Sequence, residues 1–98
     1  MAKMHMTRPN LLVFHCPGCL YDHLVGVNGR QILGAAGTMI SWEWDGSLDR
    51  PTIAPSLLIF KDSDDRRCHS FIEDGKIMFL ADSCHSLKGK TVDLPEWN

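Results

Sequence analysis

The placement of the four cysteines constrains the fold of this chain more than any other feature. Two of them stand in a Cys-Pro-Gly-Cys knuckle at positions 16–19, and the other two each precede a histidine, at 68–69 and 84–85. Two thiolates two residues apart, completed by thiol or imidazole groups from distant positions, are the usual construction of a tetrahedral zinc site. The sequence therefore predicts one zinc ion that ties together distant parts of a small domain.

Each later pair is expected to supply one ligand, because neighbours on an extended chain point to opposite sides. In the first pair the cysteine is preferred to His69, and in the second the histidine is slightly preferred to Cys84. The predicted zinc ligands are Cys16, Cys19, Cys68 and His85.

Two other interpretations of the cysteines are weaker. A thioredoxin-like redox pair needs a long helix after the knuckle, and Gly26, Asn28 and Gly29 end any helix within about two turns. A disulfide framework is disfavoured because the N-terminus lacks the apolar core of a signal peptide, which predicts a reducing cytosolic environment. Metal binding is therefore the favoured use of these thiols.

Length and charge restrict the function further. The 98 residues predict one domain, 1–98, with residues 1–9 as a flexible N-terminal segment. Hydrophobic residues make up 44% and charged residues 22%, which is an ordinary globular composition. The formal net charge of −2 provides no field that would attract nucleic acid or an anionic membrane, and the apolar runs are too short to span one.

The hydrophobic pattern is that of short strands rather than helices. Strands are expected at 11–14, 38–44, 56–60 and 91–94, while 20–27 fits either a helical turn or a strand and 61–67 is a charged loop. Asn28-Gly29 is a tight-turn signal. These features predict a mainly β domain, a small sandwich or open barrel with short strands stapled by the zinc site.

The most specific local prediction is a hairpin over residues 67–82. If Asp74-Gly75 forms a two-residue type I′ turn, the register follows directly. The expected facing pairs are Ile72 with Ile77, Ser70 with Phe79, and Cys68 with Ala81. In this register Cys68 and His69 point to opposite faces of the sheet, so they should not bind one metal together.

With these motifs in view, the chain resembles a family of small proteins carried by phages and prophages and often labelled "ammonia monooxygenase". The resemblance rests on His-Cys-Pro-Gly-Cys at 15–19, the stretch 42–57, Cys-His-Ser-Phe-Ile at 68–72, and the segment 85–95. It implies that Cys16, Cys19, Cys68, His69 and His85 are motif positions. Cys84 departs from the pattern, which favours His85 as the fourth ligand, and Leu20 stands where a glycine is common. The label itself fails, because ammonia oxidation in a membrane enzyme needs spanning helices and a redox-active metal.

The function expected from these observations is a phage-type accessory module in the host cytosol. A closed structural zinc would hold a β domain that binds a host or phage protein and turns nothing over. The alternative is a zinc-dependent hydrolase with an open metal position and His69 or Asp82 as general base. A weaker alternative is a zinc-ribbon-like nucleic-acid binder, which the acidic net charge disfavours.

Overall fold

The computed structural model describes residues 2–33, 39–59 and 67–97, and these residues form strands and turns without a helix. The expected mainly β fold is confirmed. No helix in the described part of the chain has the length and hydrophobicity to cross a membrane. The strands in chain order are β1 (His5–Arg8), β2 (Leu11–His15), β3 (Asp22–Gly26), β4 (Ile32–Leu33), β5 (Met39–Ile40), β6 (Glu43–Trp44), β7 (Ile53–Ile59), β8 (Cys68–Glu73), β9 (Lys76–Phe79) and β10 (Thr91–Asp93).

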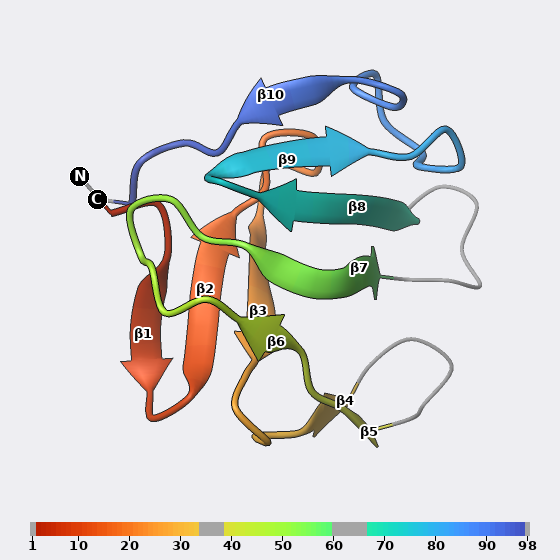
Figure 1. Ribbon diagram of the computed structural model, residues 1–98. Coiled ribbons are helices and arrows are strands. Elements are labelled where there is room, and N and C mark those ends of the chain that lie inside the picture. Colours follow the sequence, from red (N-terminus) through yellow and green to blue (C-terminus); the bar gives the residue numbers. More distant parts are fainter. Residues whose placement is uncertain (1, 34–38, 60–66, 98) are drawn as a thin grey trace.

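Most of these strands belong to two antiparallel sheets. One sheet has the order β1-β2-β3 and the other the order β10-β9-β8-β7-β6, while β4 and β5 form a short ribbon. In Figure 1 the strands of the five-stranded sheet cross in front of β2 and β3, so the two sheets form the layers of a small sandwich.

Buried apolar side chains fill the space between the two layers. The three-stranded sheet contributes Leu12, Phe14 and Val25, and the five-stranded sheet contributes Ile53, Leu57, Ile72, Ile77 and Phe79. Burying a large apolar side chain stabilises the fold by about 1.5–3 kcal/mol. Inward and outward residues alternate along β8 and β9, so the opposite face of the five-stranded sheet is open to solvent.

The predicted hairpin register is confirmed between β8 and β9. Ser70 pairs with Phe79 and Ile72 pairs with Ile77, while Asp74 and Gly75 have φ values of 51° and 76°, as a type I′ turn requires. The ladder ends at Phe79. The chain then turns, so the third expected pair lies outside the described ladder.

The expectations for four other segments have different outcomes. Residues 1–9 were expected to be flexible, but Met4 is fully buried and His5–Arg8 forms β1 against β2. The ambiguous segment 20–27 contains β3, and the strand expected at 38–44 is interrupted between β5 and β6. The loop at 61–67 lies outside the described residues except for Arg67.

Candidate active site and metal centre

Four potential metal ligands meet where the two sheets join. Cys16 directly follows β2, Cys19 lies in the turn after it, Cys68 begins β8 and His85 lies in the loop after β9. Their ligand atoms all lie within 4.8 Å of one another. The structure thus brings together the four residues predicted from the sequence, two from each layer of the sandwich.

The spacing of these atoms fits a tetrahedral ion. The Sγ atoms of Cys16 and Cys68 are 3.9 Å apart, and Cys68 Sγ is 3.7 Å from His85 Nε2. A tetrahedral zinc with ordinary bond lengths separates two sulfurs by about 3.8 Å and a sulfur from a nitrogen by about 3.6 Å. Three thiols and one imidazole also form a soft donor set, which excludes the hard cations that prefer oxygen ligands.

The thiols of the cluster cannot all ionise without a cation. Hydrogen bonds from Cys19 and then Cys68 hold the pKa of the Cys16 thiol far below its usual value. The same contact with Cys16 raises the pKa of Cys19 to about 12 and raises the pKa of Cys68 well above its ordinary range. A thiolate at Cys16 therefore keeps the thiols of Cys19 and Cys68 protonated. A bound divalent cation would instead favour the deprotonated form of all three thiols.

Gly18 lets the His85 ring approach the knuckle. A Cβ atom added to Gly18 would overlap Cε1 and Nε2 of the His85 imidazole and would lie 2.6 Å from its Nδ1. The ring also packs edge-on against Phe79, with centroids 4.4 Å apart. His85 therefore has little room to move aside.

We expect Gly18→Ala to behave almost like loss of a ligand, because the methyl group would displace His85 from the cluster. Elemental analysis of the purified variant should find metal well below one equivalent per chain. Gly46→Ala is the matched control, since nothing lies within 4 Å of a Cβ added there, although its φ of 88° strains that variant too. Full metal content in Gly18→Ala would show that His85 is not a ligand.

The neighbouring candidates lie outside the cluster. Cys84 is exposed, and His15 makes a hydrogen bond to Asp22 at 3.0 Å. Leu20 is exposed and has a φ of 65°, a left-handed conformation that favours glycine. This backbone conformation is a physical reason for glycine at the position after such a knuckle.

A second constellation lies on the outer face of the five-stranded sheet. His69 Nε2 is 3.1 Å from the Ser56 hydroxyl oxygen, and His69 Nδ1 is 3.1 Å from Asp82 Oδ2 and 3.2 Å from Oδ1. The His69 side chain is 23% exposed and that of Asp82 is 50% exposed, so the group is accessible from solvent. A hydroxyl, an imidazole and a carboxylate linked in this order form the arrangement of a serine hydrolase triad.

The hydrogen-bond partners determine the tautomer of His69. A carboxylate only accepts hydrogen bonds, so Nδ1 carries the proton that Asp82 accepts. Nε2 is then left with a lone pair and accepts the hydrogen bond that the Ser56 hydroxyl donates. This is the protonation state in which an imidazole removes a proton from serine.

The backbone around His69 holds the Asp82 turn in place. The buried Ser83 hydroxyl accepts a hydrogen bond from His69 N at 3.0 Å and donates one to His69 O at 2.9 Å. Leu80 N also donates to His69 O at 2.8 Å. These contacts tie the turn that carries Asp82 to the strand that carries the histidine.

Ser56 lies in an irregular part of β7. The pairing of β7 with β8 shifts between Ile53 and Leu57, which leaves the stretch 54–56 outside regular register. The indole of the buried Trp42 donates a hydrogen bond to the Ser56 carbonyl at 3.1 Å. Trp42 therefore fixes the backbone that presents the hydroxyl.

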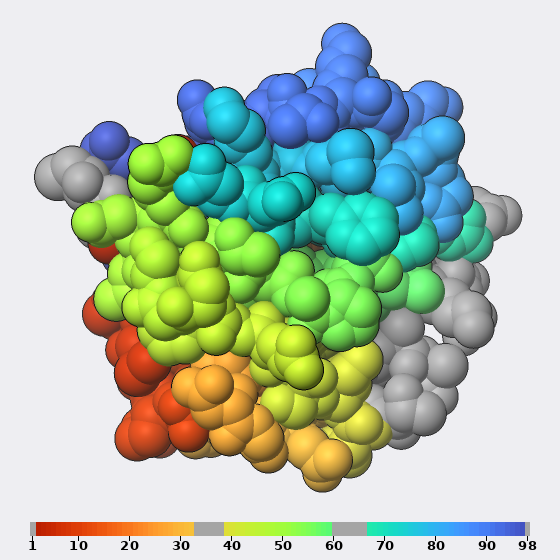
Figure 2. Space-filling model, viewed as in Figure 1, coloured from red at the N-terminus to blue at the C-terminus, as the bar shows by residue number. Residues whose placement is uncertain are grey.

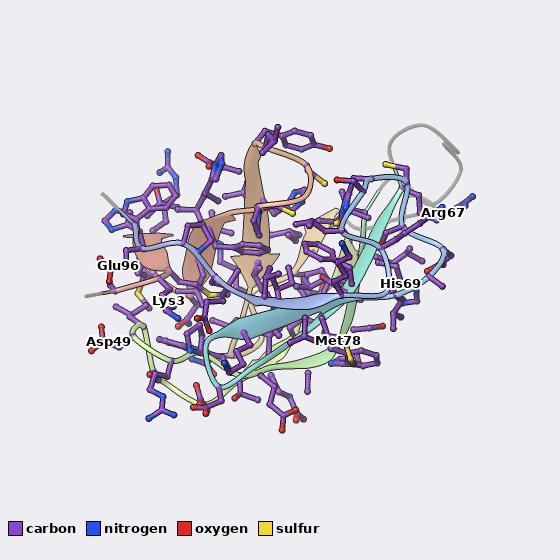
Figure 3. All side chains as sticks on the ribbon, turned by 90° about the horizontal axis from the view of Figure 1, so that it is seen from above. Lys3, Asp49, Arg67, His69, Met78 and Glu96 are labelled. Carbon is purple, nitrogen blue, oxygen red and sulfur yellow. The ribbon has the colours of Figure 1, made fainter. Side chains whose placement is uncertain are left out.

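The two constellations occupy opposite faces of β8. Cys68 is buried in the four-residue Cys/His cluster, whereas the next residue, His69, faces outward to Ser56 and Asp82. Figure 3 shows the labelled His69 on the five-stranded sheet. His69 and Asp82 are candidate bases from the sequence alone, whereas Ser56 is not recognisable there, because no local signal marks a serine in an irregular strand as a nucleophile.

A family comparison bears directly on the outer-face constellation. The model of the family described as "Bacterial ubiquitination-like system serine protease (BubE)" matches residues 1–80, so the chain belongs to this family. Ser56 and His69 lie within the matched region, and Asp82 lies two residues beyond it. No curated protein and no solved structure matches the chain.

Membership of this family corrects the function expected from the sequence. The prediction of a phage accessory module that binds a partner without turnover is wrong, because the family is one of serine proteases. The metal motif is visible in the sequence, whereas Ser56, His69 and Asp82 come together only when three separate segments meet. The resemblance to phage and prophage proteins stays a prediction.

Proposed function

We propose that this member of the bacterial ubiquitination-like serine protease family hydrolyses amide bonds with Ser56 as nucleophile. His69 acts as general base and then general acid, and Asp82 orients it. The observation that carries the proposal is the continuous chain of contacts from Ser56 Oγ through the imidazole to the Asp82 carboxylate, at 3.1 Å on both sides. Its spacing matches the hydrogen-bond reach that nucleophile and base require.

The proposed reaction has two stages. Ser56 Oγ attacks the carbonyl carbon of the scissile bond while its proton passes to His69 Nε2, and Asp82 stabilises the imidazolium. The C–N bond then breaks, His69 returns the proton to the leaving nitrogen, and the acyl group remains on Ser56 as an ester. A water molecule that loses its proton to His69 hydrolyses this ester and restores the serine hydroxyl.

The proposed substrates are proteins that carry the modifier of such a system. An amide bond at the end of a protein modifier, to a peptide extension or to an amine of a target, is the bond class that this chemistry cleaves. The half-exposed side chain of Asp82 and the open outer face of the sheet support a large substrate, because both lie at the surface of the protein.

We also infer that the ion at the four-residue cluster is zinc and that its role is structural. Four protein ligands fill a tetrahedron, which is typical of structural sites. Since Cys68 and His69 face opposite sides of β8, the ion holds the strand in place and takes no part in proton transfer. Zinc would complete the joint between the two sheets in a chain too short to gain much stability from its core alone.

A fluorophosphonate probe tests the catalytic proposal. The probe forms a covalent bond with an activated serine hydroxyl and should modify the protein once, with the adduct on the peptide that contains Ser56 in a mass spectrum. Ser56→Ala should abolish labelling, and Ser86→Ala is the control because Ser86 is exposed and lies in the loop after β9. Labelling that persists in Ser56→Ala, or no labelling of the wild type, would overturn the proposal.

A further inference from the structure

Two large apolar side chains lie on the solvent face of the five-stranded sheet. Phe71 is 40% exposed and Met78 is 42% exposed, and they stand directly opposite each other on β8 and β9. Glu73 and Lys76 form the next outward pair and bound the row with charges. An antiparallel sheet with one open face usually presents polar residues there, so a facing apolar pair is a departure.

This apolar pair borders the proposed nucleophile. Leu57 pairs with Ser70 and Ile53 pairs with Ile72, so Phe71 faces the irregular stretch 54–56 of β7, which ends at Ser56. Ala54 and Pro55 in this stretch are also exposed. Figure 2 shows this face, where β7 and β8 form one continuous surface, and in Figure 3 the labelled Met78 points away from the three-stranded sheet. We call Phe71 and Met78 the apolar row.

The position of His69 indicates which side of the scissile bond meets the apolar row. His69 must protonate the leaving nitrogen, so the leaving group lies toward His69 and Asp82. Phe71 is two residues further along β8, on the side of His69 away from the turn that carries Asp82. The acyl part of the substrate therefore extends over the apolar row.

We propose that the apolar row is the specificity subsite for the acyl side of the substrate and that it takes an apolar side chain of an extended polypeptide segment. This inference rests on the proposed function, because it takes Ser56 as the nucleophile. Phe71 and Met78 are both partly exposed, so recognition comes from covering these two side chains. The charged pair Glu73–Lys76 limits the apolar area along the strands.

The experiment uses a panel of acylated tetrapeptide aminomethylcoumarins, in which each position in turn carries leucine, phenylalanine, aspartate or lysine. The wild-type protein should prefer an apolar residue at one position. Phe71→Ala should lower kcat/KM for the preferred peptide by roughly 10- to 100-fold, mainly through KM, which is the range for loss of an apolar contact. Met78→Ala should lower it less, and Phe71→Leu should retain most of the preference.

Controls separate this inference from the proposed function. The rate of fluorophosphonate labelling at Ser56 should be unchanged in Phe71→Ala, because the small probe does not need the row. Leu24→Ala and Met39→Ala change exposed apolar residues on β3 and β5 and should leave the panel unchanged. If the probe does not label the wild-type protein, the proposed function is overturned. If the probe labels Ser56 normally but the wild type cleaves none of the peptides, shows no preference among them, or keeps its preference in Phe71→Ala, only the role of the apolar row is overturned.

Discussion

Replacing Ser56 by alanine is expected to lower kcat on the order of 10⁶-fold, with metal content and thermal unfolding unchanged. The hydroxyl is the proposed nucleophile, and loss of the nucleophile or base of a triad removes covalent catalysis as a unit. Ser56 is half-buried on the outer face, so the missing oxygen leaves no cavity in the core. Activity on a protein or peptide amide, measured beside circular dichroism and elemental analysis, checks this expectation.

Asp82→Asn should lower kcat by about 10⁴-fold for a different reason. The amide group can donate a hydrogen bond to His69 Nδ1, which moves the imidazole proton to Nε2 and leaves no acceptor for the Ser56 hydroxyl. Asp22→Asn is the matched control, because Asp22 makes a similar contact with His15 at 3.0 Å on the three-stranded sheet. Retention of more than a hundredth of wild-type activity in both Ser56→Ala and Asp82→Asn would show that other residues carry the reaction.

Replacing Cys16, Cys19 or Cys68 by serine is expected to remove the metal and unfold the domain. The free energy of binding a structural zinc is roughly 10–16 kcal/mol at neutral pH, comparable to or above the about 5–15 kcal/mol by which small domains are stable. Wild-type protein should contain about one zinc per chain, and the three variants should contain none and lose their cooperative thermal transition. His85→Ala should behave in the same way.

The exposed thiol provides the control for this series. Cys84→Ser should keep one zinc and a normal unfolding curve, since Cys84 lies outside the four-residue cluster. Chelation of the metal should also abolish activity although the ion is remote from the chemistry, because Cys68 adjoins His69 and His85 lies three residues after Asp82. A folded, active and metal-free Cys68→Ser variant would contradict the structural role.

The hairpin and the knuckle are the features that the local sequence predicted correctly. A type I′ turn at Asp74-Gly75 has one register that places Ile72 and Ile77 together in the core, so the β8–β9 pairing followed from the pattern. The same register correctly separated Cys68 from His69. Two cysteines at knuckle spacing, with a further cysteine and a histidine from distant positions, likewise have few other uses in a short chain, and the structure brings those four residues together.

Residues 1–9 and the broken strand at 38–44 show where the pattern stopped being informative. Whether Met4 is buried depends on a distant partner: Lys3 and Met4 donate backbone hydrogen bonds to the Leu48 carbonyl. A segment this short has no local preference strong enough to predict such a contact. These differences left the fold class unchanged because the core strands were recognised.

The sequence by itself determined the mainly β class, the hairpin and the four residues of the Cys/His cluster, because each depends on residue types at short or characteristic spacing. Only the tertiary structure decided that Ser56, His69 and Asp82 meet. Ser56 reaches His69 through the pairing of β7 with β8 and through an irregularity in β7 that periodicity does not predict. The connection between these two strands carries no turn signal that would set their register. Asp82 reaches the same imidazole because Ser83 holds its turn against the backbone of β8. A catalytic arrangement built from three segments depends on the relative positions of strands, which long-range packing decides rather than local sequence.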